Sequence, residues 1–155
     1  MVYRAKAAEL IRAAREDVRM TQAELATATG LHQPTIAAYE SGRRTPSDAT
    51  LRKLLDAALT RPSIALAVLA DEINSLARLH GISNVRVFGS VLDGSDTARS
   101  DIDLLVSPHA SVSLFELGAF AAQVQLITGF PVDVLTDAQA AAPDLAHVSR
   151  EAVSL

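Results

Sequence analysis

Residues 85–106 read VRVFGSVLDGSDTARSDIDLLV, and this stretch decides the fold of the C-terminal part of the chain. A run of β-forming residues at 85–88 ends in Gly89-Ser90, and a second such run covers residues 102–106. Because successive side chains of a strand point to opposite faces, Asp101 and Asp103 are expected on the same side. The pattern predicts two short strands that carry paired carboxylates beside a Gly-Ser turn.

Paired carboxylates and a Gly-Ser turn together favour phosphate chemistry. Two carboxylates so close repel each other unless a divalent cation lies between them, and Mg²⁺ prefers a couple of carboxylates plus substrate phosphates. The turn at Gly89-Ser90 offers backbone N–H groups and a hydroxyl to a phosphate. Asp133, in the β-rich run FPVDVLT, supplies a third carboxylate on a neighbouring strand. Each aspartate alone would be read as a helix cap or a strand-edge charge, and only the full spacing predicts a nucleotide-transfer site.

The flanking sequence alternates between helices and strands. Apolar residues at helical spacing predict a helix over residues 64–80, which ends at Gly81. A capping box formed by Ser113 and Glu116 predicts a second helix over residues 114–128, and a third strand follows at 132–135. We therefore expect an α/β (α+β) domain with a small mixed sheet.

The pattern GS, ten residues, DID and a later strand aspartate is similar to the polymerase-beta-type nucleotidyltransferase superfamily, specifically to its minimal members. The resemblance covers nearly all of residues 64–155. It implies that Gly89 and Ser90 bind the triphosphate of ATP and that Asp101 and Asp103 hold Mg²⁺. By the same resemblance Asp133 completes the metal site and activates the attacking hydroxyl.

One position departs from that family. Relatives commonly carry an arginine immediately before the second glycine, whereas this chain has Asp93 before Gly94. A negative charge at this position is expected to weaken ATP binding rather than assist it.

The N-terminal part shows a succession of short helices. An amphipathic pattern over residues 3–19 places Leu10, Ala14 and Val18 on one apolar stripe. A Thr21/Glu24 capping box begins a second helix that ends at Gly30. A third helix is expected to begin near Pro34 and end at Ser41-Gly42, and a fourth to run from Ser47 to about Leu59. Thr60-Arg61-Pro62-Ser63 reads as a linker, which divides the chain into residues 1–62 and 63–155.

Residues 20–54, MTQAELATATGLHQPTIAAYESGRRTPSDATLRKL, resemble the Cro/repressor-like (XRE) helix-turn-helix family. The resemblance implies an all-α, lambda-repressor-like domain whose third helix enters the major groove of double-stranded operator DNA. It implies a base contact for Gln33, a contact of Thr35 with a thymine methyl or a phosphate, and core or turn positions for Leu25, Ala26, Gly30, Leu31, Ile36 and Leu51. Phosphate contacts are implied for Gln22, His32, Arg43 and Arg44. Ala37 and Ala38 leave a sparse reading surface, so one module is expected to bind weakly and to need dimerisation.

Composition and charge agree with two different tasks. Residues 1–62 hold 10 Lys/Arg against 7 Asp/Glu, whereas residues 63–155 hold 4 against 11, so only the first part is suited to DNA. With no cysteine in the chain, disulfides, cysteine-ligated zinc and thiol nucleophiles are excluded. The sequence lacks an apolar signal core and a run long enough to span a membrane, so we expect a cytoplasmic protein without a membrane partner.

Minimal nucleotidyltransferases resemble the antitoxin halves of toxin–antitoxin pairs, some of which transfer AMP from ATP to a tyrosine of a HEPN ribonuclease toxin. The resemblance therefore implies an antitoxin that represses its own operon and assembles as a homodimer or as a hetero-oligomer with its toxin. An alternative is a DNA-binding regulator whose second domain is catalytically silent and serves nucleotide sensing, toxin binding or dimerisation. A third, a toxin that modifies tRNA ends, is disfavoured because the acidic second part offers only Arg78, Arg86, Arg99 and Arg150 to RNA.

Overall fold

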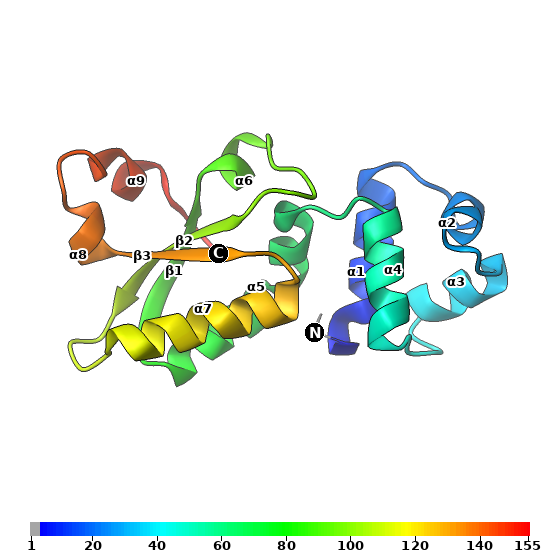
Figure 1. Cartoon of the computed structure of the whole chain (residues 1–155), viewed down its shortest axis with the longest axis horizontal. Helices are drawn as coiled ribbons and strands as arrows, with labels where there is room; N and C mark the ends of the chain where they lie inside the picture. The colour runs from blue at the N-terminus through cyan, green and yellow to red at the C-terminus, as the bar shows by residue number, and fades with distance from the viewer. Residues whose placement is uncertain (1–3) are drawn as a thin grey trace.

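The computed structural model describes residues 4–155 and has two parts, a bundle of short helices followed by an α/β part (Figure 1). Tyr3, where the predicted first helix begins, lies outside the described residues. Within residues 4–155 no helix is long and apolar enough to cross a membrane. The helical part comprises a short 3-10 turn, η1, and four α-helices: η1 Arg4–Lys6, α1 Ala7–Asp17, α2 Gln22–Thr29, α3 Gln33–Glu40 and α4 Asp48–Ala57.

The ends of these helices follow from local side-chain chemistry. Thr21 and Glu24 form the expected capping box at the start of α2, and Gly30 ends the helix with a left-handed φ of 66°. The hydroxyl of Ser47 accepts a hydrogen bond from the backbone N–H of Thr50 and begins α4. Pro34 lies in the first turn of α3, where a missing N–H has no cost.

Two predicted helix ends are wrong. The first helix ends at Asp17, because Arg19 adopts a φ of 56°, and Val18 is 36% exposed rather than part of the buried stripe. The fourth helix ends at Ala57, and Leu59, with a φ of 49°, is 65% exposed. In both cases an apolar residue at helical spacing falls in the turn after the helix, which periodicity alone does not distinguish from the last helical turn.

The α/β part is built on a four-stranded mixed sheet with the strand order β3-β2-β1-β4. Strand β2 pairs antiparallel with β1 and parallel with β3, and β4 pairs antiparallel with the other edge of β1. The strands are β1 Ile82–Phe88, β2 Ile102–Pro108, β3 Val132–Thr136 and β4 Val153–Ser154. The helices are α5 Pro62–Leu79, α6 Ser90–Asp93, α7 Leu114–Thr128, α8 Asp137–Ala140 and α9 Ala146–Glu151.

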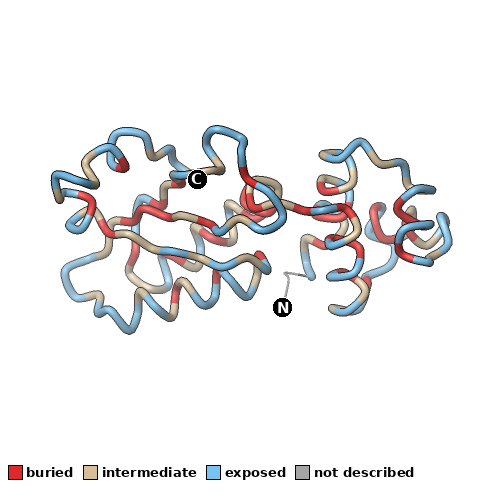
Figure 2. Tube along the Cα trace, turned by 45° about the horizontal axis from the view of Figure 1, so that its top comes forward, coloured by how far each residue is buried: buried red, intermediate tan, exposed pale blue. Residues whose placement is uncertain are grey.

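The two faces of the sheet are covered by different helices (Figure 1). Helices α5 and α7 pack on one face, where Val87, Ile102 and Leu104 belong to the main core. On the other face α8 and α9 cover a smaller cluster around Leu105 and Val148. The buried segments of Figure 2 run along the sheet and continue into the helical part, and a single core cluster includes residues of both.

The expected strands and the helix over residues 114–128 are confirmed, with longer strands than the sequence suggested. Helices α8 and α9 and strand β4 were not predicted, because each is too short to show a period. The expected turn at Gly89-Ser90 continues into the short helix α6.

The expected linker is an ordered junction. Arg61 donates to the carboxylate of Asp17 in α1, at 2.8 Å, and to Asp96 in the α6–β2 loop, at 2.9 Å. The other oxygen of Asp96 accepts from the backbone N–H of Ser63 at 2.7 Å, and the Asp96 side chain is 0% exposed. The junction therefore fixes the helical part against the α6–β2 loop, while the division of domains at residue 62 stays a prediction.

Candidate functional site

The aspartates of β2 and β3 stand side by side on one face of the sheet. Asp103 pairs in register with Asp133 on one side and with Phe88 on the other. Asp101 comes immediately before β2 and is exposed. The structure thus brings Asp103 and Asp133 together at the start of two parallel strands, with Asp101 two residues upstream.

The electrostatic environment of Asp103 reflects this arrangement. Burial raises the pKa of the Asp103 carboxyl, and the charges of Asp133 and Asp101 raise it further. Three carboxylates therefore repel one another at this edge of the sheet, and a bound cation would relieve that repulsion.

Gly89 leaves room for the Asp103 carboxylate. Its φ of 72° and ψ of −149° are a backbone conformation that side chains rarely adopt, and a Cβ at this position would lie 2.4 Å from Oδ2 of Asp103. Gly89 also precedes Ser90, the first residue of α6. The close approach of the Gly-Ser turn to the acidic strand thus depends on glycine.

The donor set fits Mg²⁺ better than a metal that needs a closed protein cage. Within residues 4–155, no three Asp, Glu, His or Cys side chains are gathered closely enough to hold a metal ion by themselves. Mg²⁺ is usually bound by one or two carboxylates together with substrate phosphates and water, so such a cage is not required. Asp103 and Asp133 supply hard oxygens, and the Asp103 side chain is only half-buried while Asp133 is exposed.

Two further groups near this face are already engaged. Asp93 accepts a hydrogen bond from the backbone N–H of Ser95 at 2.9 Å, and hydrogen bonds with the side chain and the backbone of Ser95 lower the pKa of the Asp93 carboxyl. The guanidinium of Arg86 pairs with Asp137, which also accepts from the hydroxyl of Ser107. Asp93 thus stabilises its own turn, and the charge of Arg86 is neutralised within the face that α8 covers.

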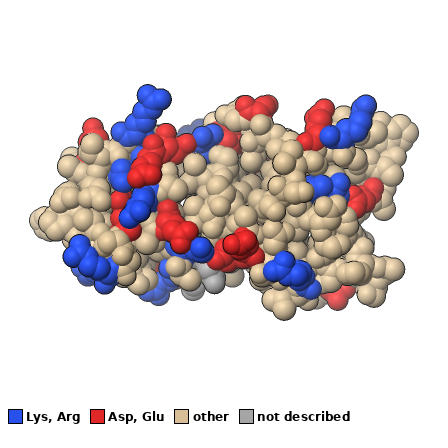
Figure 3. Space-filling view, turned by 180° about the vertical axis from the view of Figure 1, so that it is seen from behind, with Lys and Arg blue, Asp and Glu red and all other residues tan. Residues whose placement is uncertain are grey.

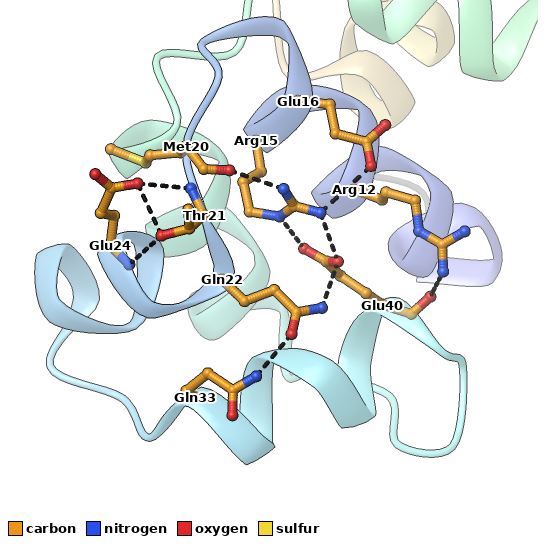
Figure 4. Close-up of polar contacts among 9 residues, drawn as sticks. All are labelled: Arg12, Arg15, Glu16, Met20, Thr21, Gln22, Glu24, Gln33 and Glu40. Atoms are coloured by element: carbon orange, nitrogen blue, oxygen red, sulfur yellow. Dashed lines mark hydrogen bonds and ion pairs between the residues drawn. The ribbon is translucent and has the colours of Figure 1, made fainter.

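In the helical part, the two glutamines expected to contact DNA are joined to each other (Figure 4). Nε2 of Gln33 donates to Oε1 of Gln22 at 2.8 Å, and Nε2 of Gln22 donates to Oε2 of Glu40 at 2.9 Å. Arg15 donates to both oxygens of the Glu40 carboxylate, from Nε to Oε1 at 2.6 Å and from Nη2 to Oε2 at 3.0 Å. Hydrogen bonds therefore connect Arg15 of α1 to Glu40 at the buried end of α3. From Glu40 they continue through Gln22 of α2 to Gln33 at the exposed start of α3.

The remaining predicted DNA contacts lie around the same surface. His32 and Gln33 are exposed at the start of α3, and Thr35 is half-buried. The guanidinium of Arg44 lies 5.6 Å from the centre of the Tyr39 ring, and Nε of Arg43 donates to Ser41 at 3.0 Å. On the face drawn in Figure 3, basic and acidic side chains are interspersed rather than gathered in one basic patch. The residues expected to contact DNA lie at the starts of α2 and α3 and in the loop after α3.

Sequence reasoning missed the groups that hold these sites in place. Glu40 carries a carboxylate with a side chain only 2% exposed; burial raises its pKa, but the hydrogen bonds from Arg15 and Gln22 outweigh burial and keep that pKa below its usual range. Arg61 and Asp96 likewise join segments far apart in the chain. The available signal for Glu40 was its helical spacing from buried Ile36, which puts a charged residue on an apolar stripe.

Comparisons with known proteins give separate family matches for the two parts of the chain. The helix-turn-helix family matches residues 11–58, and the family described as polymerase beta, nucleotidyltransferase matches residues 71–152. A solved structure assigned as a minimal nucleotidyltransferase is 31% identical, with a TM-score of 0.55, and the match covers 60% of this chain and 95% of that one. A search of curated proteins finds no significant match.

Proposed function

The chain belongs to the polymerase beta nucleotidyltransferase family and carries a helix-turn-helix domain before it, and from this premise we propose that it is an antitoxin that transfers AMP to its toxin. The observation that supports transfer is the acidic row of Asp103 and Asp133 beside the turn that Gly89 opens. The helix-turn-helix domain supports the second half of the proposal, repression of the antitoxin's own operon.

The proposed reaction moves the adenylyl group of ATP to a hydroxyl, in this proposal a tyrosine hydroxyl of a HEPN-like toxin. The hydroxyl oxygen forms a bond to the α-phosphorus, the bond from that phosphorus to the β-phosphate oxygen breaks, and pyrophosphate leaves. The hydroxyl proton passes to a carboxylate. Asp133 is the candidate for this base because it is exposed on the edge strand β3.

The chain's own residues position these groups. The backbone of the Gly89-Ser90 turn and the Ser90 hydroxyl would hold the triphosphate beside Asp103. Asp103 and Asp133, with Asp101 two residues upstream, would supply the oxygen ligands for Mg²⁺, which would neutralise phosphate charge when bound together with the substrate phosphates.

A second function is supported by Asp93. The Asp93 carboxylate is exposed in the turn where relatives commonly carry a cation, three residues after Ser90, and its hydrogen bonds with Ser95 lower its pKa. Repulsion there favours a DNA-binding regulator whose nucleotidyltransferase domain binds a toxin or senses a nucleotide without turnover.

A measurement of the partner's intact mass distinguishes the two proposed functions. The purified chain is incubated with the product of the neighbouring gene, ATP and Mg²⁺, and the partner's intact mass is measured. Enzymatic neutralisation predicts whole AMP additions to the partner. An unmodified partner in a stable complex would contradict transfer and favour the silent regulator.

A further inference from the structure

A groove of about 700 Å³ lies between the helical part and the α/β part. One wall is formed by α1, α4 and the start of α5, and the other by the turn before β2 and the end of α7 with the segment that leads into β3. In Figure 1 the beginnings of β2 and β3 face the helical part, so the groove meets the edge of the sheet where both strands start.

Two segments that line the groove are followed closely in the chain by aspartates of the candidate site. Ser100 lines it and precedes Asp101, and Pro131 lines it and is two residues before Asp133. The backbone N–H of Ile102 donates to the carbonyl of Pro131 at 2.9 Å, which ties the two lining segments together. The Gly89-Ser90 turn is not among the lining residues. The groove therefore ends beside the edge of the sheet where Asp101 and Asp133 follow in the chain, and it does not include the position expected for the triphosphate.

The charges of the groove select an acidic ligand. Arg52 on α4 and Arg99 in the turn before β2 line opposite walls, and neither forms an ion pair within the described part of the chain. Asp56 is the single acidic lining residue, so the groove carries a net positive charge from two arginines against one aspartate. Leu55 and Phe130 supply an apolar floor. Guanidinium groups pair with carboxylates through two parallel hydrogen bonds, and the floor suits an aromatic or aliphatic side chain.

The walls are held at a fixed separation. Arg61 joins Asp17 of the helical wall to Asp96, three residues before Arg99 in the opposite wall. Thr60, which lines the groove, donates its hydroxyl hydrogen bond to the carbonyl of Leu55 at 2.7 Å. A groove with walls joined in this way exists before the ligand arrives, which lowers the cost of binding.

We propose that this groove binds the acceptor segment of the partner, a polypeptide stretch in which acidic residues flank the hydroxyl-bearing residue. The inference rests on the proposed transfer function and deepens it by naming the substrate class and the surface that selects it. Arg52 and Arg99 hold the flanking carboxylates, the apolar floor receives a neighbouring apolar side chain, and the acceptor hydroxyl is directed towards the edge that carries Asp101 and Asp133.

The test measures peptide binding in the absence of nucleotide, so that no transfer reaction takes place. The full chain is titrated against a fluorescein-labelled Glu-Glu-Tyr-Glu-Glu peptide at low salt, without nucleotide, and the anisotropy is followed. Arg52→Ala and Arg99→Ala are each expected to weaken binding about fivefold, and the double variant at least tenfold, whereas Arg78→Ala, an exposed arginine outside the groove, leaves it unchanged. A Lys-Lys-Tyr-Lys-Lys peptide should not bind.

Three results would overturn the proposal: equal binding by the double variant and wild type, equal binding of the basic peptide, or displacement of the acidic peptide by AMP, which would make the groove a nucleotide site. The same titration with Asp101→Asn/Asp103→Asn separates this proposal from the transfer function. That variant should bind the peptide as the wild type does. Loss of transfer with retained peptide binding would therefore count against the transfer function and not against the groove. Loss of peptide binding with retained transfer would refute only the proposal that the groove binds the acceptor segment.

Discussion

Nε2 of Gln33, at the start of the expected recognition helix, donates a hydrogen bond to Oε1 of Gln22, at the start of the preceding helix, over 2.8 Å. Because Gln22 in turn donates to buried Glu40, the orientation of Gln33 is fixed before DNA arrives. A fixed amide loses little side-chain freedom on binding and retains its Oε1 for a base edge or a second donor.

The first prediction concerns this surface. Gln33→Ala together with Arg43→Ala should weaken binding to the DNA upstream of the gene by about tenfold to a hundredfold, since one base contact contributes roughly 1–3 kcal/mol. Loss of Arg43 should also reduce the slope of log affinity against log salt by about one. A mobility-shift titration at several salt concentrations measures both, with Arg150→Ala in the α/β part as the control. Unchanged affinity and slope would remove these residues from the DNA interface.

The second prediction concerns the charge that holds the helical domain together. Arg15→Ala leaves the Glu40 carboxylate buried without its cationic partner, and loss of one partner of a buried pair costs about 3–5 kcal/mol. Urea unfolding should show this loss, and Arg15→Met combined with Glu40→Leu should recover most of it. If Arg15→Ala alone unfolds like wild type, the pair has no structural role.

The third prediction concerns Gly89. Gly89→Ala would place a Cβ against the Asp103 carboxylate in a backbone conformation that alanine adopts only with strain. Nucleotide transfer should fall by at least about tenfold, because the turn must move away from Asp103. Gly118→Ala is the matched control, since its Cβ has no neighbour within 4 Å and alanine favours the helix. Full transfer by Gly89→Ala would show that the close approach is dispensable.

The fourth prediction concerns the junction and pH. The hydrogen bonds from Arg61 lower the pKa of Asp17, so the stabilisation from this pair is fully present above the carboxyl's ordinary pKa and is lost as pH falls through its lowered pKa. Asp17→Asn should therefore be less stable than wild type by about 1 kcal/mol near pH 7, and the difference should shrink below about pH 4. Thermal unfolding across this range measures it. A difference that stays constant with pH would mean that the Asp17 charge is not coupled to folding.

The helices and strands that could be predicted from the sequence are those with a hydrophobic periodicity, a capping box or a recognisable motif. The Thr21/Glu24 and Ser113/Glu116 boxes mark helix starts because each satisfies backbone donors locally. The alternation around Ile102 predicted a strand, and its register confirms Asp103 beside Asp133. Their roles as metal ligands remain predictions.

Long-range contacts escaped prediction for a physical reason. Arg61 meets Asp17 across 44 residues and Asp96 across 35, and no local pattern records which distant charge a side chain will pair with. Residues 60–63 read as a linker because Pro and Ser favour turns, yet Pro62 begins α5. The groove between the two parts depends on that junction and so could not be predicted either.

The most direct test of the transfer function is pyrophosphate release by the purified chain mixed with its neighbouring-gene partner, ATP and Mg²⁺. The wild type and Asp144→Asn, an exposed aspartate of the α8–α9 segment, should release pyrophosphate in step with partner modification. Asp101→Asn/Asp103→Asn should release none. Equal release by the double variant would contradict the assignment of Asp101 and Asp103 to the catalytic site, and no release by any variant, the wild type included, would contradict transfer itself.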